Sequence, residues 1–106
     1  MLFLLHVKLR KPESMSRQAF YSLWREEAAA ALKALERGAV QALYKVAGKD
    51  EVIALLEADS AAQLDRALHS MPMWRRGYGH LATEITWTPL RPYAEWAEEL
   101  SRLAQA

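Results

Sequence analysis

The stretch AVQALYKVAGKDEVIALLEA, residues 39–58, decides the fold of this chain of 106 residues. Two runs rich in Val, Ile, Leu and Tyr, residues 39–47 and 51–58, are typical of β-strands. The triplet Gly48-Lys49-Asp50 that separates them is typical of a turn. The stretch is therefore predicted to be a β-hairpin.

A strand and a long helix are predicted before the hairpin. Residues 2–10 alternate between two sides, and Phe3, Leu5, Val7 and Leu9 share the apolar side. Pro12 ends this strand, because proline cannot donate to a sheet ladder. A helix capped by Ser14 or Ser16 then runs to residue 37 and stops at Gly38, the residue type expected just past a helix end.

A helix, a strand and a last helix are predicted after the hairpin. Ser60-Ala61-Ala62-Gln63 has the spacing of a capping box, and Pro72 closes the helix that it starts. Residues 73–80 are predicted to be a loop, and residues 81–88 a strand that ends at Pro89. A last helix with Pro92 in its first turn completes the chain.

The order βαββαβ followed by a helix predicts an α+β protein with a ferredoxin-like, four-stranded antiparallel sheet. The length suits one domain, residues 1–106, with a core over 1–90 and a C-terminal helix over 91–106. Two helices cover only one face of such a sheet, so the other face, which carries Leu2 and Leu4, needs a partner. We therefore expect a homodimer or a higher homo-oligomer.

The composition of the chain argues against several classes of binding partner. A net charge of +1 lacks the basic excess of proteins that bind nucleic acid, and no apolar stretch has the length of a membrane span. The chain has no Cys, and His6, His69 and His80 lack the spacing of metal ligands. Neither a phosphate-binding glycine motif nor a nucleophile elbow is present. We expect a cytoplasmic protein that binds no nucleic acid, membrane or metal.

Glu27 is the main candidate for chemistry. It lies about 20° from Phe20 around the axis of the long helix, in the middle of the apolar side. Burial raises the pKa of a carboxyl group unless a cation or hydrogen bonds compensate, and such a group can serve as a general acid or base near neutral pH. The structural alternative is an ion pair with Lys45, Lys8 or an arginine.

Three further candidates for a catalytic role lie on the predicted strands. His6 is on the opposite side of its strand from Phe3, so it meets Glu27 only near a strand end or across a subunit boundary. Tyr44 and Lys45 are adjacent on a strand and face opposite sides, so only one of them can share the pocket of Glu27.

Three residues of the predicted loop form a further candidate cluster. Trp74, Arg75 and Arg76 could wall a pocket and attract an anion, or simply anchor the loop.

Several segments together resemble the muconolactone delta-isomerase family. The resemblance covers roughly residues 1–90, and Glu27 falls on the glutamate of a Glu-Lys pair in the first helix of that family. The segments that carry it are MLFLLHVKLRKP (1–12), LYKVAG (43–48), EADS (57–60), MPMW (71–74) and EITWTPL (84–90).

The resemblance implies a dimeric α+β barrel that isomerises a small anionic lactone of aromatic-compound catabolism without a cofactor. In this interpretation Glu27 carries the proton. The other roles that it implies are electrophilic contacts for His6, Tyr44 or Lys45, an anchor for the substrate carboxylate at Arg75 or Arg76, and further substrate contacts for Trp24 and Trp74.

The chain departs from the family pattern at Ala28, which replaces the lysine after the glutamate, and at Tyr44-Lys45, which replaces Trp-Arg. Trp74-Arg75-Arg76 replaces Phe-Pro-Tyr and is followed by an insertion that reaches His80. An amphipathic helix replaces the C-terminal segment of the family. Two alternatives therefore stay open: a non-catalytic ligand-binding or assembly module with the same barrel, and a cofactor-free oxygenase.

Overall fold

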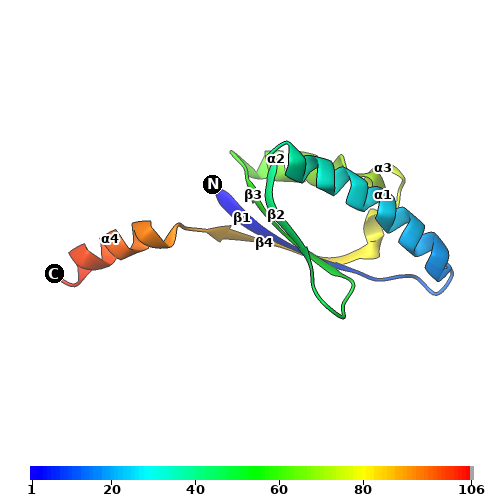
Figure 1. Ribbon diagram of the computed structural model, residues 1–106, viewed down its shortest axis with the longest axis horizontal. Helices are drawn as coiled ribbons and strands as arrows, with labels where there is room; N and C mark the ends of the chain where they lie inside the picture. Colours follow the sequence, from blue (N-terminus) through cyan, green and yellow to red (C-terminus); the bar gives the residue numbers. More distant parts are fainter. Residues whose placement is uncertain (106) are drawn as a thin grey trace.

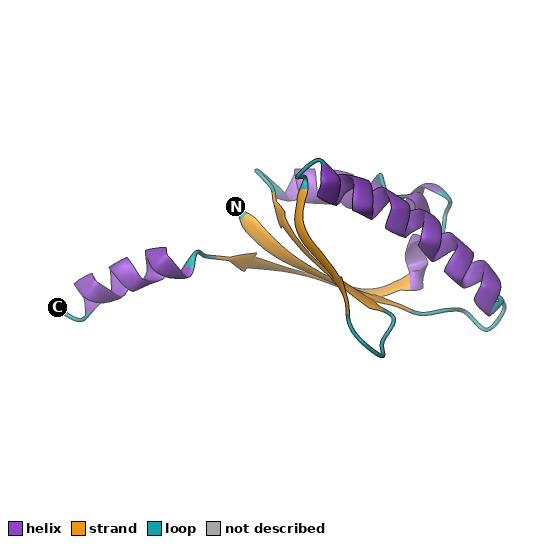
Figure 2. Ribbon diagram, in the orientation of Figure 1, coloured by secondary structure: helices purple, strands orange, loops and turns teal. Residues whose placement is uncertain are grey.

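A four-stranded antiparallel sheet with helices on one face forms the body of the protein (Figure 1). The computed structural model describes residues 1–105. The strand order is β2-β3-β1-β4, with β1 over Leu2–Leu9, β2 over Val40–Lys45, β3 over Glu51–Glu57 and β4 over Ala82–Leu90. Helices α1 (Arg17–Glu36), α2 (Ala61–His69) and α3 (Pro72–Arg75) lie together on one side of the sheet (Figure 2). The predicted α+β architecture is confirmed.

The core lies between the sheet and these helices. The alternation along β1 places Val7 and Leu9 on the helix side, where both are buried. The first cluster consists of Val7, Leu9, Phe20, Leu23, Met73 and Leu81, and the second of Ala54, Leu56, Ala58 and Leu64. Phe20 and Met73, which are 2% and 1% exposed, join α1 and α3 to the sheet.

The other sheet face carries the second set of β1 side chains. Leu4 lies opposite Leu55 of β3, and His6 lies opposite Ile53. Leu2 lies opposite Leu90 of β4. None of α1, α2 and α3 covers this side (Figure 1). We call it the open face.

The helix ends follow the predicted signals. Of the two serines, Ser16 caps α1, and its Oγ accepts the N–H of Ala19 at 3.0 Å. Gly38, just past α1, has a φ of +82°, a left-handed conformation that glycine adopts without strain. Ser60 Oγ accepts the N–H of Gln63 at 3.1 Å and so caps α2.

Two predicted boundaries were wrong. Strand β4 continues through Pro89 to Leu90, because β4 is an edge strand, where a proline needs no ladder partner for its missing N–H. Residues 73–80 are not only a loop: α3 begins at Pro72, and a 3₁₀ turn, η1, spans Gly79–Leu81. Pro72 separates two helices because proline is favourable at the first position of a helix.

Helix α4 (Tyr93–Leu103) extends away from the body (Figure 1). It follows β4 after two residues and makes the molecule elongated, with principal extents of 60 × 27 × 22 Å. Within residues 1–105, no helix has both the length and the apolar character that a membrane crossing requires.

Candidate functional site

The carboxylate of Glu27 sits at the N-terminus of α3. Glu27 lies on the side of α1 that faces the core, and its Oε1 accepts the backbone N–H of Met73 at 2.9 Å. The first N–H groups of a helix have no partner within that helix, and the N-cap residue of α3, Met71, supplies no side-chain acceptor. Glu27 therefore caps α3 from a neighbouring helix.

The environment of Glu27 disfavours its charged form. Burial raises the pKa of Glu27 above the ordinary value of 4.5, the N–H of Met73 opposes that rise, and the negative charge of Glu26 adds to it. The expected cations are engaged elsewhere, because Lys8 pairs with Glu84 and Arg76 pairs with Glu26. Among residues 1–105, no cation pairs with Glu27.

The second carboxylate oxygen of Glu27 is within reach of solvent. Glu27 is half-buried. In the described part of the chain, no fully buried side-chain oxygen lacks a hydrogen-bond partner. Oε2 of Glu27 has no such partner there, so it cannot be fully buried. One oxygen is thus held by the Met73 N–H, and the other is not fully buried.

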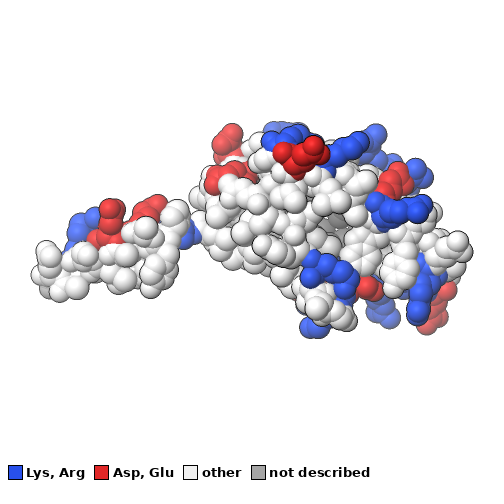
Figure 3. Space-filling model, viewed as in Figure 1, with Lys and Arg blue, Asp and Glu red and all other residues white. Residues whose placement is uncertain are grey.

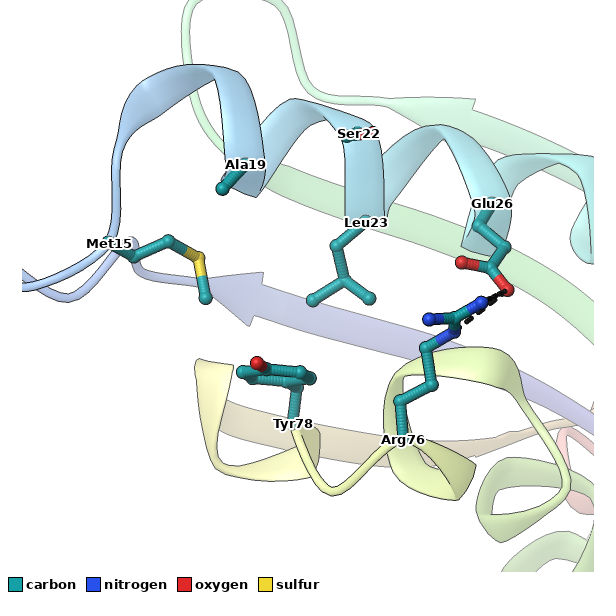
Figure 4. Close-up of a pocket in the computed structure, with 7 residues that line it drawn as sticks. All are labelled: Met15, Ala19, Ser22, Leu23, Glu26, Arg76 and Tyr78. Atoms are coloured by element: carbon teal, nitrogen blue, oxygen red, sulfur yellow. Dashed lines mark hydrogen bonds and ion pairs between the residues drawn. The ribbon is translucent and has the colours of Figure 1, made fainter.

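A hollow of about 280 Å³ lies beside this site, between α1 and the residues that follow α3 (Figure 4). Arg76 reaches across it to Glu26, with Nη2 at 2.8 Å and Nε at 2.9 Å from Oε1. The ring of Tyr78 lies below the side chain of Leu23. Glu27 itself does not line the hollow. Glu26 and Tyr78 had not been singled out in the sequence, where nothing marks them as neighbours.

The two tryptophans predicted to contact substrate pack against the core. Trp24 lies 5.7 Å from Phe20 between ring centroids. Trp74 packs so closely on Gly79 that a Cβ placed there would lie 2.5 Å from the indole Cδ1. Both are half-buried and pack against the core cluster between the sheet and α1.

His6 and Tyr44 lie on the open face, on the other side of the sheet from Glu27. Both flank Ile53 in the register of the strands. His6 Nε2 lies 2.7 Å from Glu51 Oε1, and the Tyr44 side chain is exposed. Lys45 has the opposite phase, because it pairs with a residue on the helix side, but its Nζ donates to the backbone of its own strand end at 3.1 Å.

The candidates thus fall into two groups. Glu27, Trp24, Trp74, Arg75 and Arg76 lie in the helix layer, whereas His6 and Tyr44 lie across the sheet. Residues 1–105 contain no group of three or more His, Asp or Glu side chains that could hold a metal ion.

Comparison with known proteins identifies relatives of this arrangement. A family model described as muconolactone delta-isomerase matches residues 1–95. The crystal structure of a muconolactone isomerase is similar with a TM-score of 0.69 and 20% identity, covering 87% of this chain and 90% of that one. A 5-chloro-2-hydroxyhydroquinone dehydrochlorinase from Burkholderia phenoliruptrix AC1100, in complex with 2,5-dihydroxybenzoquinone, is similar with a TM-score of 0.62 and 20% identity, covering 86% and 94%. At this identity the two structures support the fold alone. A search of curated protein sequences finds no match.

Proposed function

The chain belongs to the muconolactone delta-isomerase family, and we propose that it is a cofactor-independent isomerase that moves a proton on a small anionic lactone. Glu27 is the group that carries the proton. The observation that supports this role is the half-buried carboxylate with one oxygen held by the Met73 N–H and the other within reach of solvent.

The proposed reaction uses Glu27 twice. Its carboxylate removes a proton from the saturated carbon next to the C=C bond that is conjugated with the carbonyl group, which leaves a dienolate-like anion and a neutral carboxylic acid. The acid then returns the proton to a different carbon, the double bond moves, and the carboxylate is restored. A carboxylate whose pKa is raised is a stronger base than an ordinary one, because its charged form is less well solvated.

The cations near α3 are the proposed anchor for the carboxylate of the substrate. Arg75 is exposed and makes no ion pair with the described residues, so it is available to an anion without competition. Arg76 is bound to Glu26 and must leave it first. Arginine suits this role because its planar guanidinium can bind a carboxylate through two hydrogen bonds.

The electrophilic contact to the dienolate oxygen is proposed for the side of the sheet on which Glu27 lies. Among the predicted site residues, Lys45, Arg75 and Arg76 are the cations on that side. His6 and Tyr44 face the other way within the same chain, so we do not assign them a contact with the lactone that Glu27 deprotonates.

Hydrogen exchange tests the proposal directly. Candidate unsaturated lactones with a free carboxylate are incubated with the protein in D₂O, and proton NMR follows deuterium incorporation and movement of the double bond. Glu27→Gln keeps an oxygen for the Met73 N–H but cannot accept a proton from carbon, so exchange should fall by about 10²- to 10⁴-fold, the usual contribution of a general base.

Glu26→Gln is the matched control, because it removes the neighbouring carboxylate and its exposed ion pair with Arg76. It should retain exchange within about tenfold, as expected for the loss of an exposed ion pair. Full exchange by Glu27→Gln would exclude Glu27 as the base.

A non-catalytic ligand-binding module is the second candidate. It is favoured by the contact of Glu27 with α3, which gives the carboxylate a structural role without chemistry. Calorimetric binding of a lactone with no exchange in D₂O would support this candidate. Release of chloride from a chlorinated lactone would instead indicate elimination, the type of reaction named for the structurally similar dehydrochlorinase.

A further inference from the structure

A second hollow, of about 310 Å³, lies where the chain leaves β1 and where it enters β4. It is at the end of the body opposite α4, next to the connection between β1 and α1 (Figure 1). The two chain segments are held together by the N–H of Arg10, which donates to the carbonyl of Leu81 at 2.9 Å. The residues that line the hollow are Arg10, Lys11, Pro12, Glu13, His80, Leu81 and Thr83.

Positive side chains are in excess around this hollow. Arg10 and Lys11 carry two positive charges against the single carboxylate of Glu13, and His80 adds an imidazole. Figure 3 shows that Lys and Arg side chains gather on the half of the body away from α4, whereas the half next to α4 is largely uncharged on the face shown. Among residues 1–105, neither Arg10 nor Glu13 makes an ion pair. The guanidinium of Arg10 is therefore available to an anion.

Two further donors of the hollow are held in place by the chain itself. Lys11 Nζ donates to the carbonyls of Pro12 at 3.0 Å and Met15 at 2.8 Å, which fixes the ammonium and leaves one of its three N–H groups for a ligand. The imidazole of His80 lies 6.1 Å from the ring of Tyr78, measured between centroids, and this contact supports its position. The donors are thus arranged before any ligand binds.

The donor set favours a carboxylate over a phosphate. A guanidinium such as that of Arg10 binds the two oxygens of a carboxylate through two parallel hydrogen bonds. Phosphate sites, by contrast, draw on several backbone N–H groups at once. Here the N–H groups of Arg10 and Leu81 donate to carbonyls, and Pro12 has none. A carboxylate needs fewer donors, so the remaining side-chain donors suit it better.

The size of the hollow and its apolar lining indicate an organic acid. A volume of about 310 Å³ is at the lower end of the range for small-molecule sites and far above the roughly 30 Å³ of one water molecule. The side chains of Pro12 and Leu81 add apolar surface beside the cations. A small ring or a short hydrocarbon chain can contact this surface while the carboxylate faces Arg10.

We propose that this hollow binds a small organic acid, whose carboxylate contacts the three donor side chains and whose apolar part lies against Pro12 and Leu81. The site is separate from that of Glu27, which is ten residues beyond the start of α1 at Arg17, roughly 15 Å along the helix. None of the residues that line the hollow has a role in the proposed isomerisation. The proposal therefore goes beyond that function and does not depend on it.

The first test is a titration followed by ¹H–¹⁵N NMR at constant ionic strength, with sodium benzoate as the probe. Benzoate should shift the amide signals of the residues that line the hollow, whereas benzamide, which has the same ring without the charge, should not. Phenyl phosphate should bind more weakly than benzoate. Absence of these shifts with benzoate, or equal affinity for benzamide, would overturn the proposal. Tighter binding of phenyl phosphate would overturn the assignment to a carboxylate.

Variants identify the side chains that bind benzoate. Arg10→Gln should raise the dissociation constant about tenfold to a hundredfold, the effect of losing hydrogen bonds to a charged group. Glu13→Gln removes the repelling carboxylate and should lower the dissociation constant about twofold to fivefold. Arg102→Gln, in the last turn of α4, is the control, because it removes one positive charge at the other end of the molecule and should leave the affinity unchanged. Equal affinities of Arg10→Gln and Arg102→Gln would overturn the proposal.

Histidine ring signals give a second, site-specific measurement. The chain has three histidines, so a long-range ¹H–¹⁵N spectrum resolves few imidazoles. Benzoate should shift the ring signals of His80 and leave those of His6, which lies on the open face beside Glu51. Glu27→Gln should keep the shift of His80 even if it abolishes isomerisation, which separates the two proposals. Ring signals of His80 that do not move, or that no longer move in Glu27→Gln, would overturn the separate site.

Discussion

The contact between Glu27 and α3 can be tested by stability alone, without a substrate. Glu27→Gln retains a side-chain oxygen at the position of Oε1, so the N–H of Met73 keeps an acceptor. Glu27→Ala removes the acceptor and leaves that N–H beside a side chain that is 1% exposed. An unsatisfied buried donor costs about 1–3 kcal/mol. The alanine variant should therefore be about 1–3 kcal/mol less stable than the glutamine variant at pH 7.

The pH dependence gives a second signature with a defined sign. Because burial raises the pKa of Glu27 in the folded state above its ordinary value of 4.5, the folded protein binds this proton more tightly than the unfolded chain. The stabilisation from protonated Glu27 is thus complete below about pH 4.5 and is lost as pH rises through the raised pKa. Relative to Glu27→Gln, wild type should lose free energy of unfolding over that interval and then level off.

Urea unfolding followed by tryptophan fluorescence measures both effects for wild type and the two variants between pH 4 and pH 8. Equal stability of the glutamine and alanine variants would show that the Met73 N–H does not depend on this acceptor. A wild-type protein that gains stability over Glu27→Gln as pH rises would show that the carboxylate is favoured, not disfavoured, by its surroundings.

Three further perturbations have defined outcomes. Glu26→Gln removes the charge that helps to raise the pKa of Glu27, so the acidic limb of the exchange rate against pH should move to lower pH. Gly79→Ala forces the indole of Trp74 to move and should cost about 1–3 kcal/mol, with a changed near-UV circular dichroism spectrum; unaltered stability and spectrum would show that the contact is loose. Ser60→Ala removes the cap of α2 and should lower the free energy of unfolding by about 1 kcal/mol in urea, whereas no loss would mean that water replaces the cap.

The main elements could be predicted because their signals are local. Alternation along β1 has a period of two, so it assigns Val7 to the core and His6 to the opposite face without knowledge of the partner strands. Helical periodicity likewise places Glu27 on the side of α1 that faces the core. Such periodicity predicts which face of an element a side chain lies on, but not which residue it contacts.

The hydrogen-bond partner of Glu27 could not be predicted from the sequence. The expected partners were cations, but the contact is a backbone N–H at Met73, 46 residues away, and any residue type can supply a backbone N–H. The continuation of β4 through Pro89 could not be predicted for a similar reason. Whether proline is tolerated depends on β4 being at the edge, which follows from the strand order and not from the local residues.

The borders of the sheet have a consequence for aggregation. Unpaired strand edges recruit other chains and can seed open-ended fibrils. Here one border is β4, which Pro89 deprives of a donor, and the other is β2, which is only six residues long and has a register shift between Val40 and Ala42. Irregular, donor-poor borders disfavour continuous β-pairing between molecules. Growth of this sheet into filaments by edge-to-edge pairing is thereby disfavoured.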